Sequence, residues 1–120
     1  KPSLDSASDD AGVYSKNALA IAQRNGPVFV NFTAAWCITC KVNEINALDV
    51  DAVKLAFKDN AVTYLKGDWT NEDPAITSAL QEYGRTGVPL YLLYAKDASR
   101  ATVLPQILTP GIVLDALEAL

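Results

Sequence analysis

Two kinds of hydrophobic periodicity alternate along the chain and predict its secondary structure. Short runs of β-branched and aromatic residues predict strands at 28–33, 61–65, 90–94 and 101–104. Apolar residues at helical spacing predict helices over 13–24, 38–59, 74–83 and 109–120. Residues 96–99 have the composition of a hairpin turn between the last two strands. The predicted order is therefore helix, strand, helix, strand, helix, strand, strand, helix.

Local signals fix several helix ends and faces. Asp73 before Pro74 has the arrangement of an N-cap and a first helical residue, and Asp49 is the predicted cap of the second half of helix 38–59. The first half shows helical periodicity at Ile38, Val42, Ile45 and Leu48. The last helix opens at Thr109-Pro110-Gly111 and is expected to bury Val113, Ala116, Leu117 and Leu120.

The alternation of strands and helices predicts the fold class. Strands that alternate with helices favour parallel pairing with helices on both faces of the sheet, and the closing hairpin adds an antiparallel edge. We therefore expect an α/β fold with a central mixed β-sheet flanked by helices on both faces. The chain has 120 residues, which predicts one domain over residues 13–120. Residues 1–12, polar and rich in Ser and Asp, are the predicted linker or N-terminal tail.

Composition narrows the classes of function. Half of the residues are hydrophobic and a fifth are charged, which is typical of a globular protein. The net charge of -4 argues against binding to nucleic acid or to acidic lipid. Histidine is absent, which removes the commonest general base and the commonest metal ligand. Methionine is also absent, even at position 1, so we expect the chain to be a processed or excised piece of a longer protein.

The two cysteines, Cys37 and Cys40, are the main candidates for chemistry. Two thiols cannot form the disulfide framework of a small secreted protein, nor can they fill a tetrahedral zinc shell. A dimer could supply four thiolates, and the pair alone could hold a soft ion such as Cu(I). A purely structural bridge would close a very short loop, where the stabilisation from loop closure is least. A redox-active dithiol is therefore the favoured interpretation.

Two motifs carry a resemblance to a known family. Trp36-Cys37-Ile38-Thr39-Cys40-Lys41 follows a hydrophobic strand, and Gly87-Val88-Pro89 precedes another, which resembles the thioredoxin fold. Residues 34–44, 66–71 and 83–89 resemble the C-terminal periplasmic domain of DsbD and ScsB, which are membrane-embedded thiol:disulfide interchange proteins. ScsB relatives are associated with copper tolerance.

The resemblance implies a place in an electron relay. In that family, a transmembrane domain takes electrons from cytosolic thioredoxin, and the C-terminal domain passes them to a further periplasmic domain or partner. We therefore expect a monomeric periplasmic domain of a membrane protein. Its partners would be a transmembrane donor domain of the same or a related protein and periplasmic thiol or disulfide acceptors. Neither a metal nor an organic cofactor is expected, because a reversible Cys37–Cys40 disulfide carries the electrons.

The positions of the two cysteines predict different roles. Cys37 lies at the entry to a helix, where unpaired N–H groups and the macrodipole favour the thiolate that attacks a disulfide. Cys40 lies three residues later on the same face and would resolve the mixed disulfide. Ile38 and Thr39 supply no positive charge to hold a thiolate, so we expect a reducing pair.

The resemblance adds five residues around the dithiol. It implies a cis Pro89 beside the cysteines and a backbone at Val88 that pairs with a substrate strand. It implies that Glu44 restrains the cysteine until a partner docks, and a carboxylate there would raise the thiol pKa by like-charge repulsion. Asn31 stands where the family commonly has an Asp that takes the proton of the second cysteine; an amide cannot, which leaves Glu44 or water. Trp36 is expected to cover the dithiol and contact partners.

Several alternatives remain open at this point. Glu44 could be a solvated surface residue, Trp36 a core residue, and Pro89 an ordinary trans proline. At the level of function, the leading hypothesis is a dithiol reductase domain of the bacterial envelope. The alternatives are a free-standing cytosolic thioredoxin, a copper-binding dithiolate module, and a docking domain with idle thiols.

Overall fold

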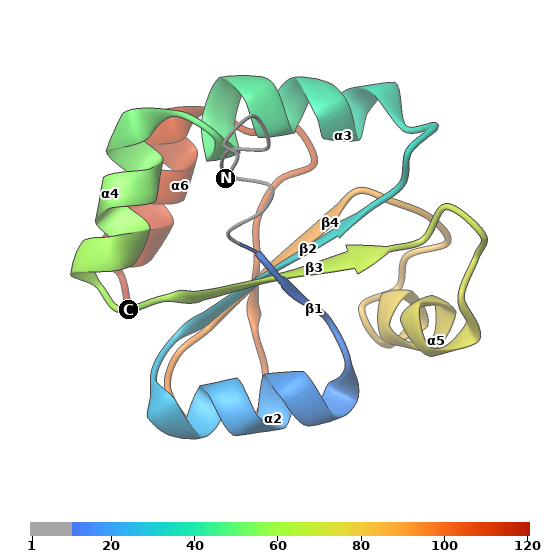
Figure 1. Cartoon of the computed structure of the whole chain (residues 1–120), viewed down its shortest axis with the longest axis horizontal. Coiled ribbons are helices and arrows are strands. Elements are labelled where there is room, and N and C mark those ends of the chain that lie inside the picture. The colour runs from blue at the N-terminus through green and yellow to red at the C-terminus, as the bar shows by residue number, and fades with distance from the viewer. Residues whose placement is uncertain (1–10) are drawn as a thin grey trace, which may run out of the picture.

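A mixed sheet lies at the centre of the molecule and helices cover both of its faces, as Figure 1 shows. The computed structural model describes residues 11–120. The strand order is β1-β3-β2-β4-β5, with β1 Gly12–Val13, β2 Val28–Thr33, β3 Thr63–Asp68, β4 Leu90–Tyr94 and β5 Thr102–Val103. The helices are α2 Lys16–Asn25, α3 Ile38–Asn43, α4 Asp51–Asp59, α5 Pro74–Glu82 and α6 Pro110–Glu118, with a π-helical turn η2 at Glu44–Leu48. The predicted fold class is confirmed.

The pairing of the strands differs from expectation at β4. β1, β3 and β2 are mutually parallel, but β4 is antiparallel to β2, with Leu90 opposite Phe32, and β5 is antiparallel to β4. The prediction of parallel pairing was therefore wrong for this strand. The chain after α5 returns to the end of the sheet where β2 finishes, so β4 starts there and runs back. This places Pro89, just before β4, at the same end of the sheet as Cys37, just after β2.

Most predicted element boundaries hold within a few residues. α5 begins as expected, with Asp73 accepting from the N–H groups of Ala75 and Ile76, and Thr109 caps α6. The predicted start of the first helix was wrong, because Val13 belongs to β1 and α2 starts only after Ser15. Gly12 in β1 belonged to the predicted tail, whose residues 1–10 lie outside the described part of the chain.

Two further boundaries needed correction. Asp49 does not cap α4: the N-cap residue is Val50, without a side-chain hydrogen bond. β3 covers 63–68 instead of the predicted 61–65, because Ala61, with φ 54°, still belongs to the turn after α4. The later end of β3 brings Lys66 and Asp68 into the sheet.

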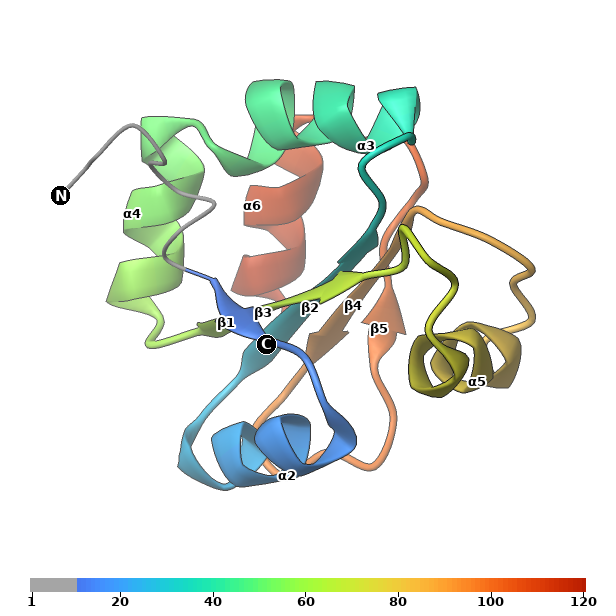
Figure 2. The same cartoon turned by 45° about the vertical axis from the view of Figure 1, so that its right-hand side comes forward.

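The alternation of side chains along β2 divides the core into two clusters. Val28, Val30 and Phe32 pack in the cluster on the side of α2 and α5, whereas Phe29 packs in the cluster with η2, α4 and α6. These two groups of helices lie on opposite faces of the sheet (Figure 2). The first cluster also contains buried residues of the other strands and of α5, namely Leu65, Ile76, Ala79, Leu80, Leu90, Leu92 and Tyr94. The second contains Leu48, Val53, Phe57, Tyr91, Leu93, Leu104, Leu108, Val113 and Leu117.

The last helix departs from its predicted apolar face at two positions. Val113 and Leu117 are buried as expected, but Ala116 is only half-buried, and Leu120 is exposed beyond the end of α6. Since α6 ends at Glu118, helical spacing no longer directs residue 120 towards the core.

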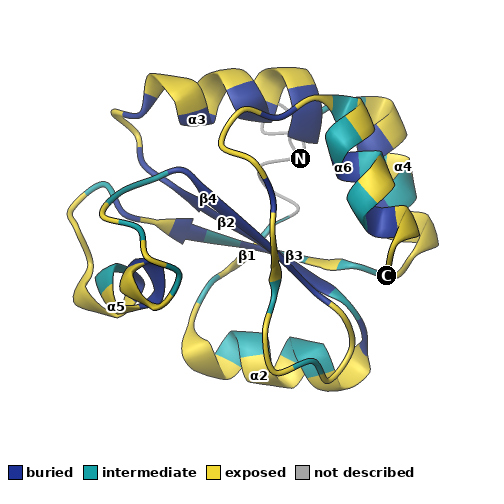
Figure 3. Cartoon of the chain, turned by 180° about the vertical axis from the view of Figure 1, so that it is seen from behind, coloured by how far each residue is buried: buried dark blue, intermediate teal, exposed yellow. Residues whose placement is uncertain are grey.

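The segment after the cysteines turns its apolar residues outward. Ile38, Val42 and Ile45 are exposed, and the side facing the sheet carries Cys40, Asn43, Glu44, Ala47 and Leu48. Figure 3 shows how exposed and buried residues alternate along this segment. Leu48 is buried although Ile45 is not, because it follows the buried Glu44 by one helical turn. The N–H of Asp49 donates to the carbonyl of Glu44 in a π-type bond at the end of this segment. Helical periodicity predicted the helix correctly, but the face that it marks is not the core face.

No helix in the described residues has both the length and the apolar content that a membrane span requires.

Candidate active site

A disulfide joins Cys37 and Cys40 at the N-terminal end of α3. Their Cα atoms are 5.3 Å apart, and Ala34 and Val88 pack around the two sulfurs. Cys37 retains 8% of its surface exposed, whereas Cys40 retains 0%. Cys37 is therefore the more accessible of the two cysteines, and Cys40 is fully enclosed.

The local backbone explains why this cysteine pair forms where it does. Cys37 has extended dihedrals at the N-cap of α3, and its Sγ accepts a hydrogen bond from the N–H of Cys40 at 3.1 Å. This is the position that a Ser or Asp oxygen takes in an ordinary cap. After reduction, the same N–H and the positive end of the helix favour the thiolate form of Cys37.

The loop before β4 closes the other side of the dithiol. Val88 packs against the cluster that contains the two cysteines, and the Val88–Pro89 peptide bond is cis. Pro89 is buried, and the Arg85 side chain donates to its carbonyl at 3.3 Å. The structure therefore brings Val88 to the dithiol and Pro89 into the adjoining loop.

Trp36 stands at the rim of the site and is 55% exposed, so it is not a core residue. Its indole N–H donates to the Thr70 carbonyl at 3.0 Å, and the N–H of Ala35 donates to Thr70 Oγ1 at 2.8 Å. The Thr70 hydroxyl in turn donates to the Asp68 carboxylate. The loop that follows β3 thus holds the loop that leads into the cysteines.

The sequence analysis used residues 66–71 for the resemblance, but it gave Asp68 and Thr70 no role in holding the loop before the cysteines. The hydrogen bond from the Thr70 hydroxyl, followed by that from its N–H, holds the pKa of Asp68 below its usual value. The sequence Asp68-Trp69-Thr70 stands shortly after the predicted strand 61–65, so its two polar side chains were visible in the sequence. Only the pairing of β3 with β2 shows that it lies beside Trp36.

A buried polar cluster lies under α3 and contains the two other predicted residues. Glu44 is only 5% exposed, which excludes the interpretation of a solvated surface residue. The Asn31 side-chain amide donates to Glu44 Oε2 at 3.2 Å and to the Tyr64 hydroxyl at 3.1 Å. Lys66 Nζ lies 3.7 Å and Lys41 Nζ lies 3.8 Å from Glu44 Oε1.

The electrostatics of this cluster centre on the Glu44 carboxylate. Two ammonium groups balance its charge and one amide donates a hydrogen bond to it, so its burial does not leave an isolated ion. Burial, together with the nearby Glu44 charge, raises the pKa of Asp49 and that of Tyr64. The sequence analysis missed Lys66, since it ended the strand at residue 65; the register that pairs Lys66 with Asn31 brings it to the cluster.

The described residues contain no group of three or more His, Cys, Asp or Glu side chains arranged to hold a metal ion.

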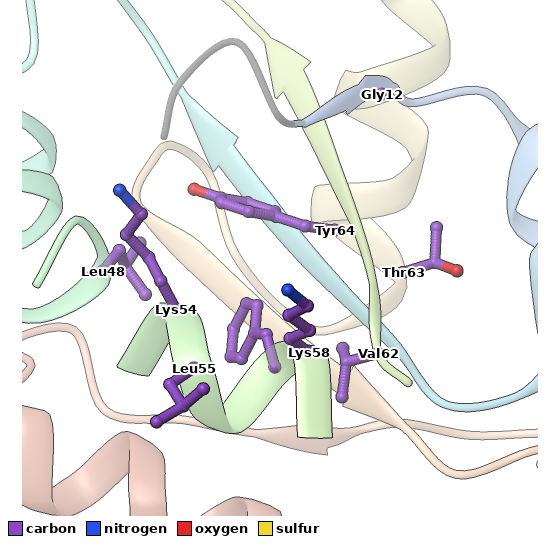
Figure 4. Close-up of a pocket in the computed structure, with 9 residues that line it drawn as sticks. Gly12, Leu48, Lys54, Leu55, Lys58, Val62, Thr63 and Tyr64 are labelled. Carbon is purple, nitrogen blue, oxygen red and sulfur yellow. The ribbon is translucent and has the colours of Figure 1, made fainter. Parts of the chain in front are cut away.

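A pocket of about 610 Å³ lies between α4 and the β1–β3 edge, where Lys54 and Lys58 rise from one side (Figure 4). Its lining consists of Gly12, Leu48, Lys54, Leu55, Phe57, Lys58, Val62, Thr63 and Tyr64. Neither cysteine lines this pocket, so it is separate from the dithiol site.

Comparison with known proteins identifies the class. Residues 13–96 match a family model described as thioredoxin-like, and the chain belongs to that family. Within it, the similarity is to DsbD. The chain is 37% identical over 79 residues to the thiol:disulfide interchange protein DsbD 1 of Pseudomonas aeruginosa. That alignment covers 65% of this chain and 13% of the relative's length.

Solved structures agree with this assignment. The oxidised C-terminal domain of Neisseria meningitidis DsbD matches with a TM-score of 0.72 and 26% identity, over 91% of this chain and 98% of that one. The reduced form of the same domain matches with a TM-score of 0.70 and 26% identity, over 88% and 96%. A thioredoxin variant of Halobacterium salinarum shares the fold, with a TM-score of 0.68 and 24% identity over 99% and 94%. The chain is therefore a thioredoxin-like domain that is similar to the C-terminal domain of DsbD and carries a disulfide-bonded Cys-x-x-Cys pair.

Proposed function

We propose that this domain relays electrons in the bacterial envelope. It receives two electrons from a membrane-embedded donor domain of the same or a related protein and passes them to periplasmic acceptor proteins. The observation that carries the proposal is the pair formed by a reachable Cys37 at a helix N-terminus and an enclosed Cys40. The similarity to the C-terminal domain of DsbD supports the place in the relay.

The proposed reaction is covalent and balanced. The Cys37 thiolate attacks a partner disulfide, forms a mixed disulfide, and displaces one partner thiolate, which takes up a proton. Cys40 then loses its proton and attacks Cys37 Sγ. The second partner thiolate leaves and is protonated, and the Cys37–Cys40 disulfide remains. The partner gains two electrons and two protons, and a donor dithiol restores the reduced pair by the reverse sequence.

The buried polar cluster suggests which residue tunes this reaction. Asn31 cannot accept the Cys40 proton at neutral pH, because an amide side chain has no basic site in that range. Glu44 is the buried carboxylic side chain among the described residues, and it follows Cys40 by one helical turn. We assign Glu44 the modulating role, with Asn31, Lys41 and Lys66 as the groups that hold its carboxylate.

The dithiol itself carries the electrons, so the proposed reaction needs neither a metal nor an organic cofactor. Trp36 and the cis loop at Val88–Pro89 border the reachable sulfur and provide the surface against which a partner backbone can lie. Trp36 supplies apolar contact, and the backbone of Val88 is the group that would pair with an extended segment of the partner.

Trapping in a whole-cell extract of the source organism, with its membranes solubilised, tests the relay. The Cys40→Ser variant cannot resolve a mixed disulfide, so partners accumulate on Cys37; the Cys37→Ser variant is the matched control. We expect two kinds of adduct with Cys40→Ser, one with an integral membrane protein and one with a periplasmic protein. Adducts with cytosolic proteins alone would support a free-standing thioredoxin instead.

The reduction potential provides an independent test of direction. No cation lies between the cysteines in sequence, and a carboxylate lies one turn beyond Cys40, so the thiolate of the reduced form gains little added stabilisation. We expect a potential close to that of thioredoxin, about -270 mV, instead of the value of about -120 mV of a strong oxidant. Equilibration of the purified domain with glutathione and dithiothreitol buffers measures it, and a value near the second figure would contradict a reductase.

A further inference from the structure

The outer side of α3 and η2 carries an apolar stripe that the fold does not use. Ile38, Val42 and Ile45 are 79%, 48% and 68% exposed, and they follow one another four and three residues apart. Residues at this spacing lie on one side of a helix. The stripe, defined here by these three residues, starts directly beside Cys37.

Neither packing nor helix propensity explains the apolar character of the stripe. The core-facing side of the same segment is filled by other residues and even carries two polar ones, Asn43 and Glu44. Isoleucine and valine are weaker helix formers than lysine, glutamate or glutamine, which normally occupy exposed helix positions. Neither burial in the core nor helix propensity therefore favours apolar residues at these positions. Exposed apolar surface of this kind marks an interaction site.

We propose that the stripe is a docking surface for the protein whose disulfide reacts with Cys37, and that it selects partners with apolar residues flanking that disulfide. The proposal deepens the exchange function proposed above and rests on it. We identify the molecule that binds the stripe from its position, because the stripe begins at the residue next to the reactive Cys37. A partner that reaches Cys37, only 8% exposed and flanked by Trp36 and Ile38, must cover the residues that adjoin it.

The dimensions of the stripe define the partner segment. Ile45 follows Ile38 by seven positions, which is about 10 Å along a helix at 1.5 Å per residue. An extended peptide covers that distance with about three or four residues at roughly 3.3 Å each. The recognised segment is therefore a short apolar flank on one side of the partner cysteine. The neighbouring exposed residues Thr39, Lys41 and Asn46 provide a polar rim.

The test uses two synthetic peptides of equal length, each with an internal disulfide. One has four apolar residues beside one cysteine, and the other has four Ser or Thr residues at the same places. Stopped-flow measurement with the reduced domain gives the rate constant for each peptide. We expect the apolar peptide to react about tenfold faster with the wild-type domain, which corresponds to about 1.4 kcal/mol.

The double variant Val42→Thr/Ile45→Thr removes apolar character while it keeps β-branched side chains and leaves the charge near the dithiol unchanged. We expect the ratio of the two rate constants to fall to within about twofold of unity. Leu55→Thr is the matched control, because Leu55 is a 58% exposed apolar residue on α4 outside the stripe. The control should keep the wild-type ratio, and thermal unfolding of all three proteins checks that they are folded.

Each outcome decides between distinct explanations. An unchanged ratio in the double variant, or an equal loss in Leu55→Thr, would overturn the docking surface. Binding of the wild-type domain, but not the double variant, to phosphatidylethanolamine–phosphatidylglycerol vesicles with no peptide preference would assign the stripe to lipid instead. Glutathione disulfide, which has no peptide flank, reports on Cys37 itself: failure of the wild-type domain to react with it would overturn the exchange function.

Discussion

Replacement of Asn31 by Asp puts the buried polar cluster to a quantitative test. Asn31 is 0% exposed, and its amide donates to Glu44 Oε2 at 3.2 Å. Asn31→Asp keeps the shape of the side chain but replaces this donor with a second carboxylate oxygen. Two like charges at that distance repel by about 5 kcal/mol at an effective dielectric constant of about 20.

The variant can escape most of this repulsion by binding one proton. Protonation at pH 7 of a carboxyl group whose pKa in the unfolded chain is about 4 costs about 4 kcal/mol, at 1.36 kcal/mol per pH unit. Protonation costs less free energy than the repulsion between the two carboxylates, so Asn31→Asp should lose up to about 4 kcal/mol of unfolding free energy at pH 7. Because the folded-state pKa of the carboxyl pair is raised, the native state binds the extra proton. The loss should therefore shrink as the pH falls, and vanish near pH 4.

Urea unfolding of the oxidised proteins from pH 4 to pH 8 measures this effect without titration of the sulfurs. The Glu44→Gln background is the control, because Asn31→Asp should cost far less when no second carboxylate faces it. Equal midpoints for Asn31→Asp and wild type at pH 7 would refute the proposed cluster. So would a loss that is independent of pH, or one that persists unchanged in the Glu44→Gln background.

Three further substitutions test other parts of the account. Burial, and then the Glu44 charge, raise the pKa of Asp49, so a charged Asp49 destabilises the native state. Above about pH 4, the urea concentration at the unfolding midpoint should therefore be higher for Asp49→Asn than for wild type. Below that pH the two midpoints should be equal. Thr70→Val should lose about 1 kcal/mol and alter the fluorescence of Trp36, while Thr70→Ser keeps both hydroxyl bonds and stays close to wild type. Gly67→Ala should cost about 1–3 kcal/mol in thermal or urea unfolding, since its Cβ would lie 2.6 Å from the buried Phe32 ring; an unchanged midpoint would show that the ring can move.

The parts of the fold that sequence predicts well depend on local signals. The strand at 28–33 and the helix starts at Asp73 and Thr109 follow from periodicity and capping within a few residues, and the structure has them in place. β1 was missed because two residues give no periodicity, and they become a strand only by pairing with β3. The direction of β4 was also missed, because the path of the connecting loop sets it and the strand's own residues do not.

In the candidate site, too, local motifs were predictable from the sequence, whereas contacts between distant segments were not. The Cys-x-x-Cys motif and Gly87-Val88-Pro89 were visible in the sequence, and the structure brings Cys37, Cys40 and Val88 together. The burial of Glu44 could not be derived, because Ile38, Val42 and Ile45 mark the opposite helix side as the apolar one. Lys66 and Thr70 reach the site through the register of β3 and the loop that follows it, which depend on contacts between distant segments.

The central claim is that Cys37 attacks and Cys40 resolves, and adduct formation in the single variants measures this most directly. Reduced Cys40→Ser and Cys37→Ser are mixed with glutathione disulfide at pH 7, and the glutathionylated fraction is followed by intact-protein mass spectrometry. The account predicts rapid formation of a stable adduct on Cys37 in Cys40→Ser, and at least tenfold slower reaction of the enclosed Cys40 in Cys37→Ser. Faster reaction of Cys40, or no adduct on either sulfur, would contradict it.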